Sequence, residues 1–316
     1  ASRRIAVDVV FVQVSPPNAD GDCSLGLAHD YLVTAMHHAR CVIAEVNADV
    51  PWVAGASLRL ADVDAWVQSD QDVVDVPAGK IGPAEEAIAQ LIASRVEDGA
   101  TLQLGIGNLP DAVLQALQGH RDLGVHSGTI GDRVADLVEA GVITNARKGI
   151  DVGTSVTGLL MGSARTRRWA HNNRALRIAG TDYTHNARVL GQTQRLTAIN
   201  SAIEVDLTGQ INAEVVAGQY LGAVGGAMDF LRAAAACDGG LPIVALPSTA
   251  RGQSRIVAQL SGPVSTPRAD AGLIVTEHGV ADLRGLSLAQ RVRAMLAIAA
   301  PEHRDLLAAQ ARQQLN

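Results

Sequence analysis

The chain has 316 residues, of which 47% are hydrophobic and 3% aromatic, and its charged residues give a formal net charge of −6. This length predicts about two domains, with a large core built from Ala, Val, Leu and Ile. Acidic and basic residues are interspersed, so we expect no nucleic-acid partner bound through a broad basic face. Since no run approaches the roughly 18 apolar residues of a membrane helix, we expect no membrane partner and a cytoplasmic location.

The first part of the sequence alternates short apolar segments with polar turns. β-Branched residues over 5–14 predict a buried strand that ends before Pro16 and Pro17, because proline cannot donate to a sheet. A helix over 27–39 and a strand over 41–46 are expected next. The polar stretch 75–80 predicts a linker and divides the chain into domains 1–80 and 81–316.

The three cysteines, Cys23, Cys41 and Cys237, form no CxxC pair. They are therefore expected to be structural thiols in a reducing compartment. The nine histidines show no spacing typical of metal ligands, such as HExxH, so no metal is expected.

The segment 101–145 has the pattern on which the functional prediction depends. An apolar strand runs into a glycine-rich corner at 105–108, and Pro110 stands in the first turn of the helix that follows. A second strand over 123–126, a small-residue turn over 127–129 and a helix from Asp132 repeat the arrangement. Such strand–turn–helix units place backbone N–H groups and helix N-termini at one sheet edge, which suits an anionic, phosphate-bearing ligand.

The remaining sequence alternates predicted helices and strands. Apolar residues at helical spacing predict an amphipathic helix over 84–96. A second glycine-rich corner over 222–230 precedes an alanine-rich helix, and another helix is expected over 288–299. Strands are expected over 175–179, 196–207, 241–246 and 273–276. This alternation predicts a parallel α/β fold.

Several stretches, read together and in order, carry a family resemblance: VSPPNADGDCSLG, AEVN, LQLGIGNLPDAVL, INSAIEVDLTGQ, ALPSTARG and VTEHGVADLRG. They resemble the acetyl-CoA hydrolase/transferase family, the class I CoA-transferases of the 4-hydroxybutyrate and succinyl-CoA:acetate type. The resemblance implies two open α/β subdomains of the NagB/RpiA-like CoA-transferase type, with acyl-CoA in the cleft between them.

In these terms, residues 1–80 are expected to be the remainder of an N-terminal subdomain that is shortened at its start. Residues 81–316 are expected to form the C-terminal subdomain with the glycine-rich CoA loops. We expect the chain to form a homo-oligomer or a complex with a second subunit.

The resemblance also indicates a missing nucleophile. In the family a glutamate attacks the acyl-CoA thioester and forms covalent glutamyl intermediates. The matching motif here reads His126-Ser127-Gly128, so Gly128 occupies the nucleophile-equivalent position. Because glycine has no side chain, the covalent route is closed at this position.

The resemblance implies roles for further residues, each with a structural alternative. Asn200 is expected to orient the acyl group, or else to satisfy hydrogen bonds at a sheet edge. Glu277 is expected to activate water as a general base, or else to hold the turn that follows it. His126 is expected to act in catalysis, or else to have a structural role. Arg165, Arg167 and Arg168 are expected to form a solvated helix face rather than to bind CoA phosphates. Leu109 and Gly225 are expected to supply oxyanion N–H donors. The implied CoA-binding residues are Gly105, Ile106, Gly107, Leu109, Val224, Gly225, Gly226, His278 and Gly279.

The expected function is therefore that of an acyl-CoA-binding enzyme that cleaves a thioester, by hydrolysis, without a glutamyl intermediate. Its substrate is expected to be coenzyme A in acyl form, with water or a small carboxylic acid as acceptor. Two alternatives stay open: a classical acyl-CoA:carboxylate CoA-transferase, and a non-catalytic CoA-binding or partner subunit.

Overall fold

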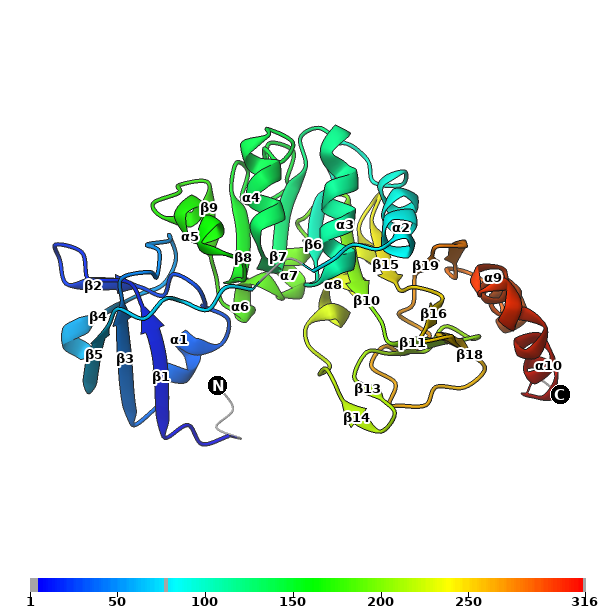
Figure 1. Ribbon diagram of the computed structural model, residues 1–316. Helices are drawn as coiled ribbons and strands as arrows, with labels where there is room; N and C mark the ends of the chain where they lie inside the picture. The colour runs from blue at the N-terminus through cyan, green and yellow to red at the C-terminus, as the bar shows by residue number, and fades with distance from the viewer. Residues whose placement is uncertain (1–4, 77–78, 315–316) are drawn as a thin grey trace. The chain divides into compact units, whose positions relative to one another are not determined.

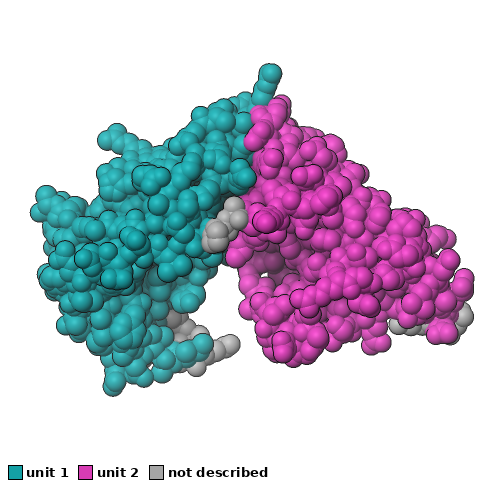
Figure 2. All heavy atoms as spheres, in the orientation of Figure 1, with its two compact units in different colours: residues 1–78, 121–192 teal, residues 79–120, 193–316 magenta. Residues whose placement is uncertain are grey.

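The computed structural model describes residues 5–76 and 79–314 (Figure 1). The chain divides into two compact units, coloured separately in Figure 2: residues 1–78 with 121–192, and residues 79–120 with 193–316. The first change of unit, between residues 78 and 79, falls within the linker expected at 75–80, of which residues 77–78 lie outside the described part of the chain. Within that part, no helix has both the length and the apolarity needed to cross a bilayer.

The first unit contains two parallel sheets and short helices. Its strands are β1 (Val9–Val14), β2 (Asp22–Ser24), β3 (Cys41–Asn47), β4 (Ser57–Arg59), β5 (Ala65–Ser69), β7 (Gly124–Ile130), β8 (Ser155–Leu160) and β9 (Leu176–Ile178). Its helices are α1 (Leu32–Met36), η1 (Leu60–Asp62), α4 (Asp132–Glu139), α5 (Ala164–Ala170), α6 (Thr181–Thr184) and α7 (Ala187–Leu190). One sheet has the order β1-β3-β5, and β7, β8 and β9 run parallel in the other.

Strand β1 shows why the first sheet forms. Val10, Val12 and Val14 are buried in one core cluster, whereas Val9 and Phe11 on the other face are exposed. Side chains two residues apart share a face of a strand, so this alternation buries one face. The predicted strand over 5–14 is confirmed in its second half, and it starts at the residue where pairing with β3 begins.

Two secondary-structure predictions in this unit are wrong. The helix expected over 27–39 is only the short α1. Ala28 forms an isolated antiparallel β-bridge with Leu159, and Asp30 has a φ of 39°, outside the helical region, so neither residue can belong to the helix. The turn expected over 127–129 lies inside β7, because Ser127 and Thr129 are in register with β8. Parallel pairing extends the strand past the small residues.

The second unit contains a parallel sheet with helical cover. Its helices are α2 (Pro83–Ala93), α3 (Asn108–Ala116), η2 (Leu117–Gly119), α8 (Ala227–Ala236), α9 (Leu288–Ile298), η3 (Pro301–His303) and α10 (Arg304–Gln314). Its main strands are β6 (Thr101–Leu104), β10 (Leu196–Ser201), β15 (Leu241–Ala245), β19 (Leu273–Thr276) and β20 (Gly279–Asp282). Shorter strands are β11 (Glu204–Asp206), β12 (Ile211–Asn212), β13 (Val215–Val216), β14 (Gln219–Tyr220), β16 (Thr249–Ala250), β17 (Gln253–Ser254) and β18 (Ile256–Val257).

The main sheet of this unit has the order β20-β19-β15-β10-β6, in which every pairing is parallel except that of β19 with β20. Helix α8 packs against β10 and β15, and α2 packs against α3 and β19. Ile88 and Ile92 of α2 are fully buried, which confirms the predicted apolar stripe. The chain therefore has the α/β class expected, and the carboxyl ends of four parallel strands meet at one edge of this sheet.

Candidate functional site

The first glycine-rich corner follows the buried strand β6. The N–H of Gly105 donates to the carbonyl of Ile199 at 3.1 Å, so the corner still pairs with β10 at its start. Gly107 has a φ of 112°, a conformation that side chains disfavour, and a Cβ built on it has no atom within 4 Å. Ile106 is 59% exposed and Leu109 lies in the first turn of α3. The corner therefore presents open backbone beside a helix N-terminus, where N–H groups have no helical partner.

The second glycine-rich corner has similar properties. Gly225 has a φ of 59°, its nearest atom to a built Cβ is the carbonyl oxygen of Ala223 at 3.9 Å, and Val224 beside it is 56% exposed. Gly226 then caps the N-terminus of α8. Both corners predicted for CoA thus have the open backbone that close approach of a ligand requires.

Asn200 lies near the carboxyl end of β10 and pairs with Gln103 of β6. The Nδ2 of Asn200 donates to Oε1 of Gln103 at 2.9 Å, and the Nε2 of Gln103 donates to Oδ1 of Asn200 at 3.3 Å. Gln103 is 4% exposed, so its amide needs these partners. The side chain of Asn200 is fixed in orientation and lies at the sheet edge where the resemblance implies the thioester.

Glu277 follows β19 and meets Ser248, which follows the neighbouring parallel strand β15. Its Oε2 accepts from the backbone N–H of Ser248 at 2.8 Å, and its Oε1 accepts from the Ser248 hydroxyl at 2.6 Å. Nε2 of His278 lies 3.7 Å from the same Oε1. Glu277 and His278 form the connection between β19 and β20, where Thr276 is in register with Gly279. Both carboxylate oxygens thus hold two loops together at this edge.

In the first unit, Gly128 lies in β7 and is half-buried. A Cβ built on it would lie 3.3 Å from Cε1 and 3.4 Å from Nε2 of His185. Neither the sequence pattern nor the resemblance identified His185, because nothing along the chain links a histidine after α6 with a glycine in β7. The structure brings the two together because α6 packs against β7 and β8.

His126 lies two residues before Gly128 and is completely buried. Its Nε2 lies 3.0 Å from the carbonyl oxygen of Thr184, and its ring centroid is 6.1 Å from that of Tyr183. Burial, with the nearby charge of Lys148, lowers the pKa of His126 to about 4. A carbonyl only accepts, so the neutral imidazole donates through Nε2 and anchors the end of α6.

A buried lysine lies in the same core. The Nζ of Lys148 donates to the carbonyls of Val125 and Thr154 at 2.8 and 2.7 Å, and burial lowers the pKa of this ammonium to about 8. Its donors therefore hold β7 to the loop before β8.

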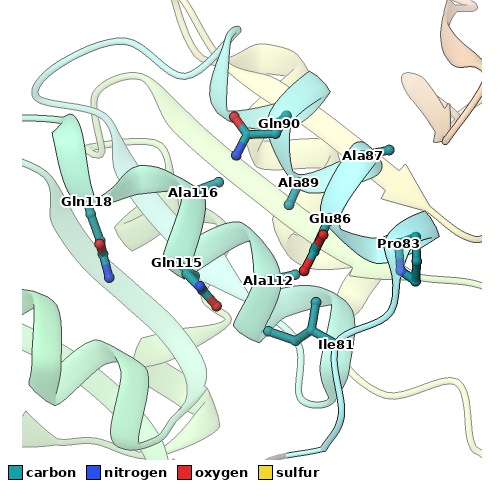
Figure 3. A pocket seen from close by; sticks show the side chains of 10 residues that line it. All are labelled: Ile81, Pro83, Glu86, Ala87, Ala89, Gln90, Ala112, Gln115, Ala116 and Gln118. Atoms are coloured by element: carbon teal, nitrogen blue, oxygen red, sulfur yellow. The ribbon is translucent and has the colours of Figure 1, made fainter.

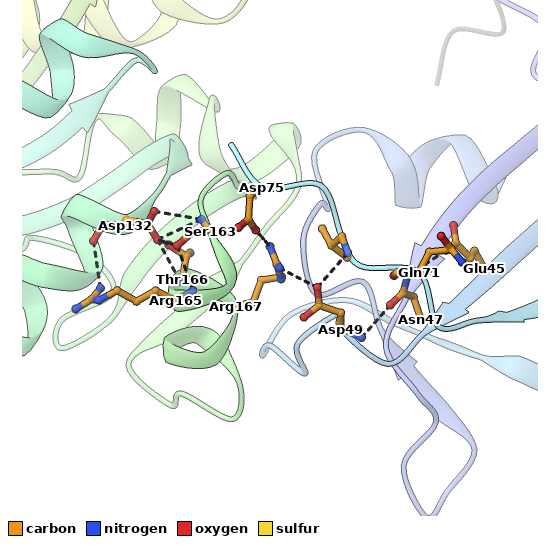
Figure 4. Close-up of polar contacts among 11 residues, drawn as sticks. Glu45, Asn47, Asp49, Gln71, Asp75, Asp132, Ser163, Arg165, Thr166 and Arg167 are labelled. Carbon is orange, nitrogen blue, oxygen red and sulfur yellow. Dashed lines mark hydrogen bonds and ion pairs between the residues drawn. The ribbon is translucent and has the colours of Figure 1, made fainter. Parts of the chain in front are cut away.

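Of the three arginines expected on a solvated face of α5, Arg168 is exposed, Arg165 is partly exposed and Arg167 is buried; Figure 4 shows the contacts of Arg165 and Arg167. Arg167 is buried, and its guanidinium contacts Asp49 at 2.8 Å and Asp75 at 2.7 Å. Arg165 contacts Glu139 and, at 2.8 Å, Asp136. The solvated-face prediction is wrong for Arg167, because carboxylates from two distant loops bury it.

One cavity of about 500 Å³ lies between α2 and α3 (Figure 3). It is lined by Ile81, Pro83, Glu86, Ala87, Ala89, Gln90, Ala112, Gln115, Ala116 and Gln118. These residues include none of the predicted site residues. Among the described residues, no group of three His, Cys, Asp or Glu side chains has the arrangement of a metal site.

Comparisons with known proteins show which family this chain is similar to. The model of the acetyl-CoA hydrolase/transferase N-terminal domain matches residues 2–77, and that of the C-terminal domain matches residues 162–311. The 4-hydroxybutyrate coenzyme A transferase of Clostridium kluyveri is 41% identical over 96% of this chain and 72% of its own length. The succinyl-CoA:acetate/propanoyl-CoA:succinate CoA transferase of Fasciola hepatica is 38% identical over 96% of this chain and 65% of its own.

A solved structure supports the same likeness. The 4-hydroxybutyrate CoA-transferase from Porphyromonas gingivalis superposes with a TM-score of 0.88 at 38% identity, covering 98% of this chain and 76% of that one. The described chain thus spans about two thirds to three quarters of the proteins it resembles.

Proposed function

The chain belongs to the acetyl-CoA hydrolase/transferase family, and on that premise we propose that it binds an acyl-CoA and hydrolyses the thioester without a glutamyl intermediate. Water attacks the thioester carbonyl, the C–S bond breaks, and a carboxylic acid and free CoA leave.

The observation that carries this proposal is the glycine at position 128. The family resemblance assigns the nucleophilic carboxylate to this position, and glycine offers no atom that can form an anhydride or a glutamyl thioester. Water can attack the thioester carbon directly, so hydrolysis needs no side chain of the protein as nucleophile.

The two glycine-rich corners support thioester binding. The N–H groups of Leu109 and Gly225 are proposed to donate to the carbonyl oxygen as negative charge develops on it. The open space beside Gly107 and Gly225 suits the approach of a pantetheine arm. The fixed amide of Asn200 is proposed to orient the acyl group.

The test is an assay of thiol release from acetyl-, propionyl-, butyryl- and succinyl-CoA in water enriched in ¹⁸O. Direct hydrolysis incorporates one ¹⁸O into the product acid in a single turnover, and borohydride treatment followed by mass analysis leaves the protein unmodified. A glutamyl adduct on the protein contradicts the proposal.

A CoA-transferase is the second candidate, favoured by the activities named for the relatives from Clostridium kluyveri and Fasciola hepatica. It requires CoA to appear on an added carboxylate, such as acetate or 4-hydroxybutyrate, at a rate that depends on its concentration. Calorimetric binding of acetyl-CoA with neither thiol release nor transfer indicates instead a CoA-binding subunit.

A further inference from the structure

We propose that Tyr220, Leu221 and Val224 form the contact surface for the acyl chain of the substrate. The preferred substrate is then the CoA thioester of an uncharged aliphatic acid, such as butyrate, rather than of a dicarboxylic acid. This inference rests on the hydrolytic function proposed above and names the substrate class of the same site. All three residues belong to the second unit.

The first support is the exposure of these side chains, which we call the acyl surface. Tyr220 at the end of β14 is 73% exposed, Leu221 is 70% exposed, and Val224 in the second glycine-rich corner is exposed as well. A single exposed apolar side chain is ordinary on a protein surface. A group of them within five residues is instead typical of a surface that a ligand or a partner covers.

The second support is the way in which the base of this segment is held. The Glu214 carbonyl accepts from the N–H groups of Leu221 and Gly222 at 2.8 and 3.1 Å. Asn212, which is completely buried, accepts through Oδ1 from the N–H groups of Glu214 and Val215 at 3.0 Å each. The apolar side chains thus start from a fixed backbone, and a surface that is already ordered loses less conformational freedom on binding.

The third support is the continuity of the acyl surface with the proposed thioester site. Val224 directly precedes Gly225, whose N–H is proposed to donate to the thioester oxygen, and consecutive Cα atoms lie about 3.8 Å apart. The first carbons of the acyl chain are therefore placed beside Val224. Figure 1 shows β13 and β14 on the side of the sheet where β10 leads into β11, and Asn212 links β11 to this hairpin.

The fourth support is the absence of charge along both glycine-rich corners. The sequence has no charged residue over 215–228 or over 101–110, and Glu214 and Asp229, which flank the first of these ranges, are acidic. The carboxylate of a succinyl group would lose water against such a surface without gaining a cation. The methyl end of a butyryl group would instead remove apolar area from water.

The expected selectivity follows from this burial. Covering one methylene group is worth about a factor of four in binding. We expect kcat/KM to rise from acetyl- to propionyl- to butyryl-CoA, by up to about 15-fold in total. Succinyl-CoA is expected to be at least about tenfold poorer than butyryl-CoA, because its carboxylate stays unpaired.

The test compares the full chain with Leu221→Ser and Val224→Ser. Leu306→Ser is the matched control, since Leu306 is a similarly exposed leucine on α10, at 61%. We expect each of the first two variants to reduce the preference for butyryl- over acetyl-CoA at least about threefold, which is most of one methylene group. The control is expected to keep the wild-type preference.

A charge-reversing variant tests the same surface by a gain of activity. Leu221→Arg supplies the cation that the segment lacks, and we expect it to raise the ratio of succinyl- to butyryl-CoA hydrolysis about two- to fivefold. A general loss of structure would lower both rates and would not raise this ratio. An unchanged ratio contradicts the placement of the acyl chain beside Leu221.

An exposed arginine on another hairpin offers an alternative partner for an acyl carboxylate. Arg251 stands in the turn between β16 and β17. Arg251→Gln is expected to change the rates with butyryl- and succinyl-CoA by the same factor. A loss confined to succinyl-CoA, with succinyl-CoA the better substrate of the wild type, overturns the assignment of an uncharged acyl group.

Binding measurements separate the failure of this inference from that of the proposed function. Calorimetric titration with acetyl- and butyryl-CoA reports the acyl contact without turnover. If the wild type releases thiol but acts on and binds both thioesters equally well, the acyl surface is wrong and hydrolysis stands. If no thiol is released, but butyryl-CoA binds more tightly and Leu221→Ser abolishes the difference, hydrolysis is wrong and the acyl surface stands. Equal binding without thiol release makes both fail.

The remaining alternative is that a second copy of the chain covers these side chains. Light scattering of the wild type and Leu221→Ser measures the oligomeric state of each. A smaller assembly for Leu221→Ser, with an unchanged preference among the acyl-CoAs, assigns the surface to an interface between copies and overturns the inference. The same assembly with a reduced preference supports it.

Discussion

Restoring a carboxylate at position 128 probes how the site is built. The backbone of Gly128 in β7 lies outside the left-handed region, so a glutamate fits the main chain without strain. Its Cβ, however, would meet the His185 ring at 3.3 Å, which is a few tenths of an ångström too close. Gly128→Glu therefore needs the imidazole to shift, and Gly128→Glu combined with His185→Ala does not.

The size of this effect follows from the cost of moving the ring. Holding a side chain about 30° away from its preferred rotamer costs about 0.5–1.5 kcal/mol. Because 1.4 kcal/mol corresponds to a factor of ten, the single variant is expected to be roughly 2- to 13-fold less active as a transferase than the double variant.

The assay measures CoA transfer from acetyl-CoA to butyrate, with borohydride trapping of the glutamyl thioester and mass analysis. Gly128→Ala is the matched control, because it makes the same Cβ contact but carries no carboxylate, and it should show no adduct. A double variant that folds, binds acetyl-CoA and transfers more slowly than the single variant refutes the reasoning about the ring. An adduct on Gly128→Ala shows that another residue is the nucleophile.

Three further predictions concern the supports of the site. The pKa of His126 is about 4 in the folded chain and 6.5 in the unfolded one, so between these pH values the unfolded state binds one more proton than the folded state. The free energy of unfolding should therefore fall by roughly 3 kcal/mol as the pH drops from 6.5 to 4. Denaturant titrations at the two pH values should show a smaller fall for His126→Gln. Arg167→Ala leaves two partly exposed carboxylates without their buried partner and should cost about 1–3 kcal/mol, whereas Arg168→Ala, on the exposed face of the same helix, should stay within about 0.5 kcal/mol in the same denaturant titration. Glu277→Ala leaves the Ser248 N–H without its acceptor and should lower stability by about 1–3 kcal/mol in the same titration.

The elements that the sequence predicted are those whose signal is local. The apolar stripe of α2 is visible in the helical spacing of its apolar residues, and the corner before α3 is visible in the glycines that precede Pro110. Both elements were therefore predicted at the positions where the structure has them. The end of β7 was misjudged because small residues at 127–129 are typical of turns, and only the register with β8 keeps them extended.

The candidate site was predictable where it depends on short motifs. Gly128 and Glu277 stand in recognisable stretches, but their partners come from other segments. His185 reaches Gly128 only because α6 packs on β7, and Arg167 is buried only because Asp49 and Asp75 converge on it. Contacts of this kind follow from the tertiary arrangement, which no local pattern encodes.

The division into units has a consequence for work with fragments. The chain changes unit after residues 78, 120 and 192, so neither unit is a continuous stretch of sequence. A gene fragment ending at any one of these points leaves at least one unit without part of its chain. Producing either unit alone would require joining its two separate pieces by a new peptide link, and a single protease cut cannot release an intact half.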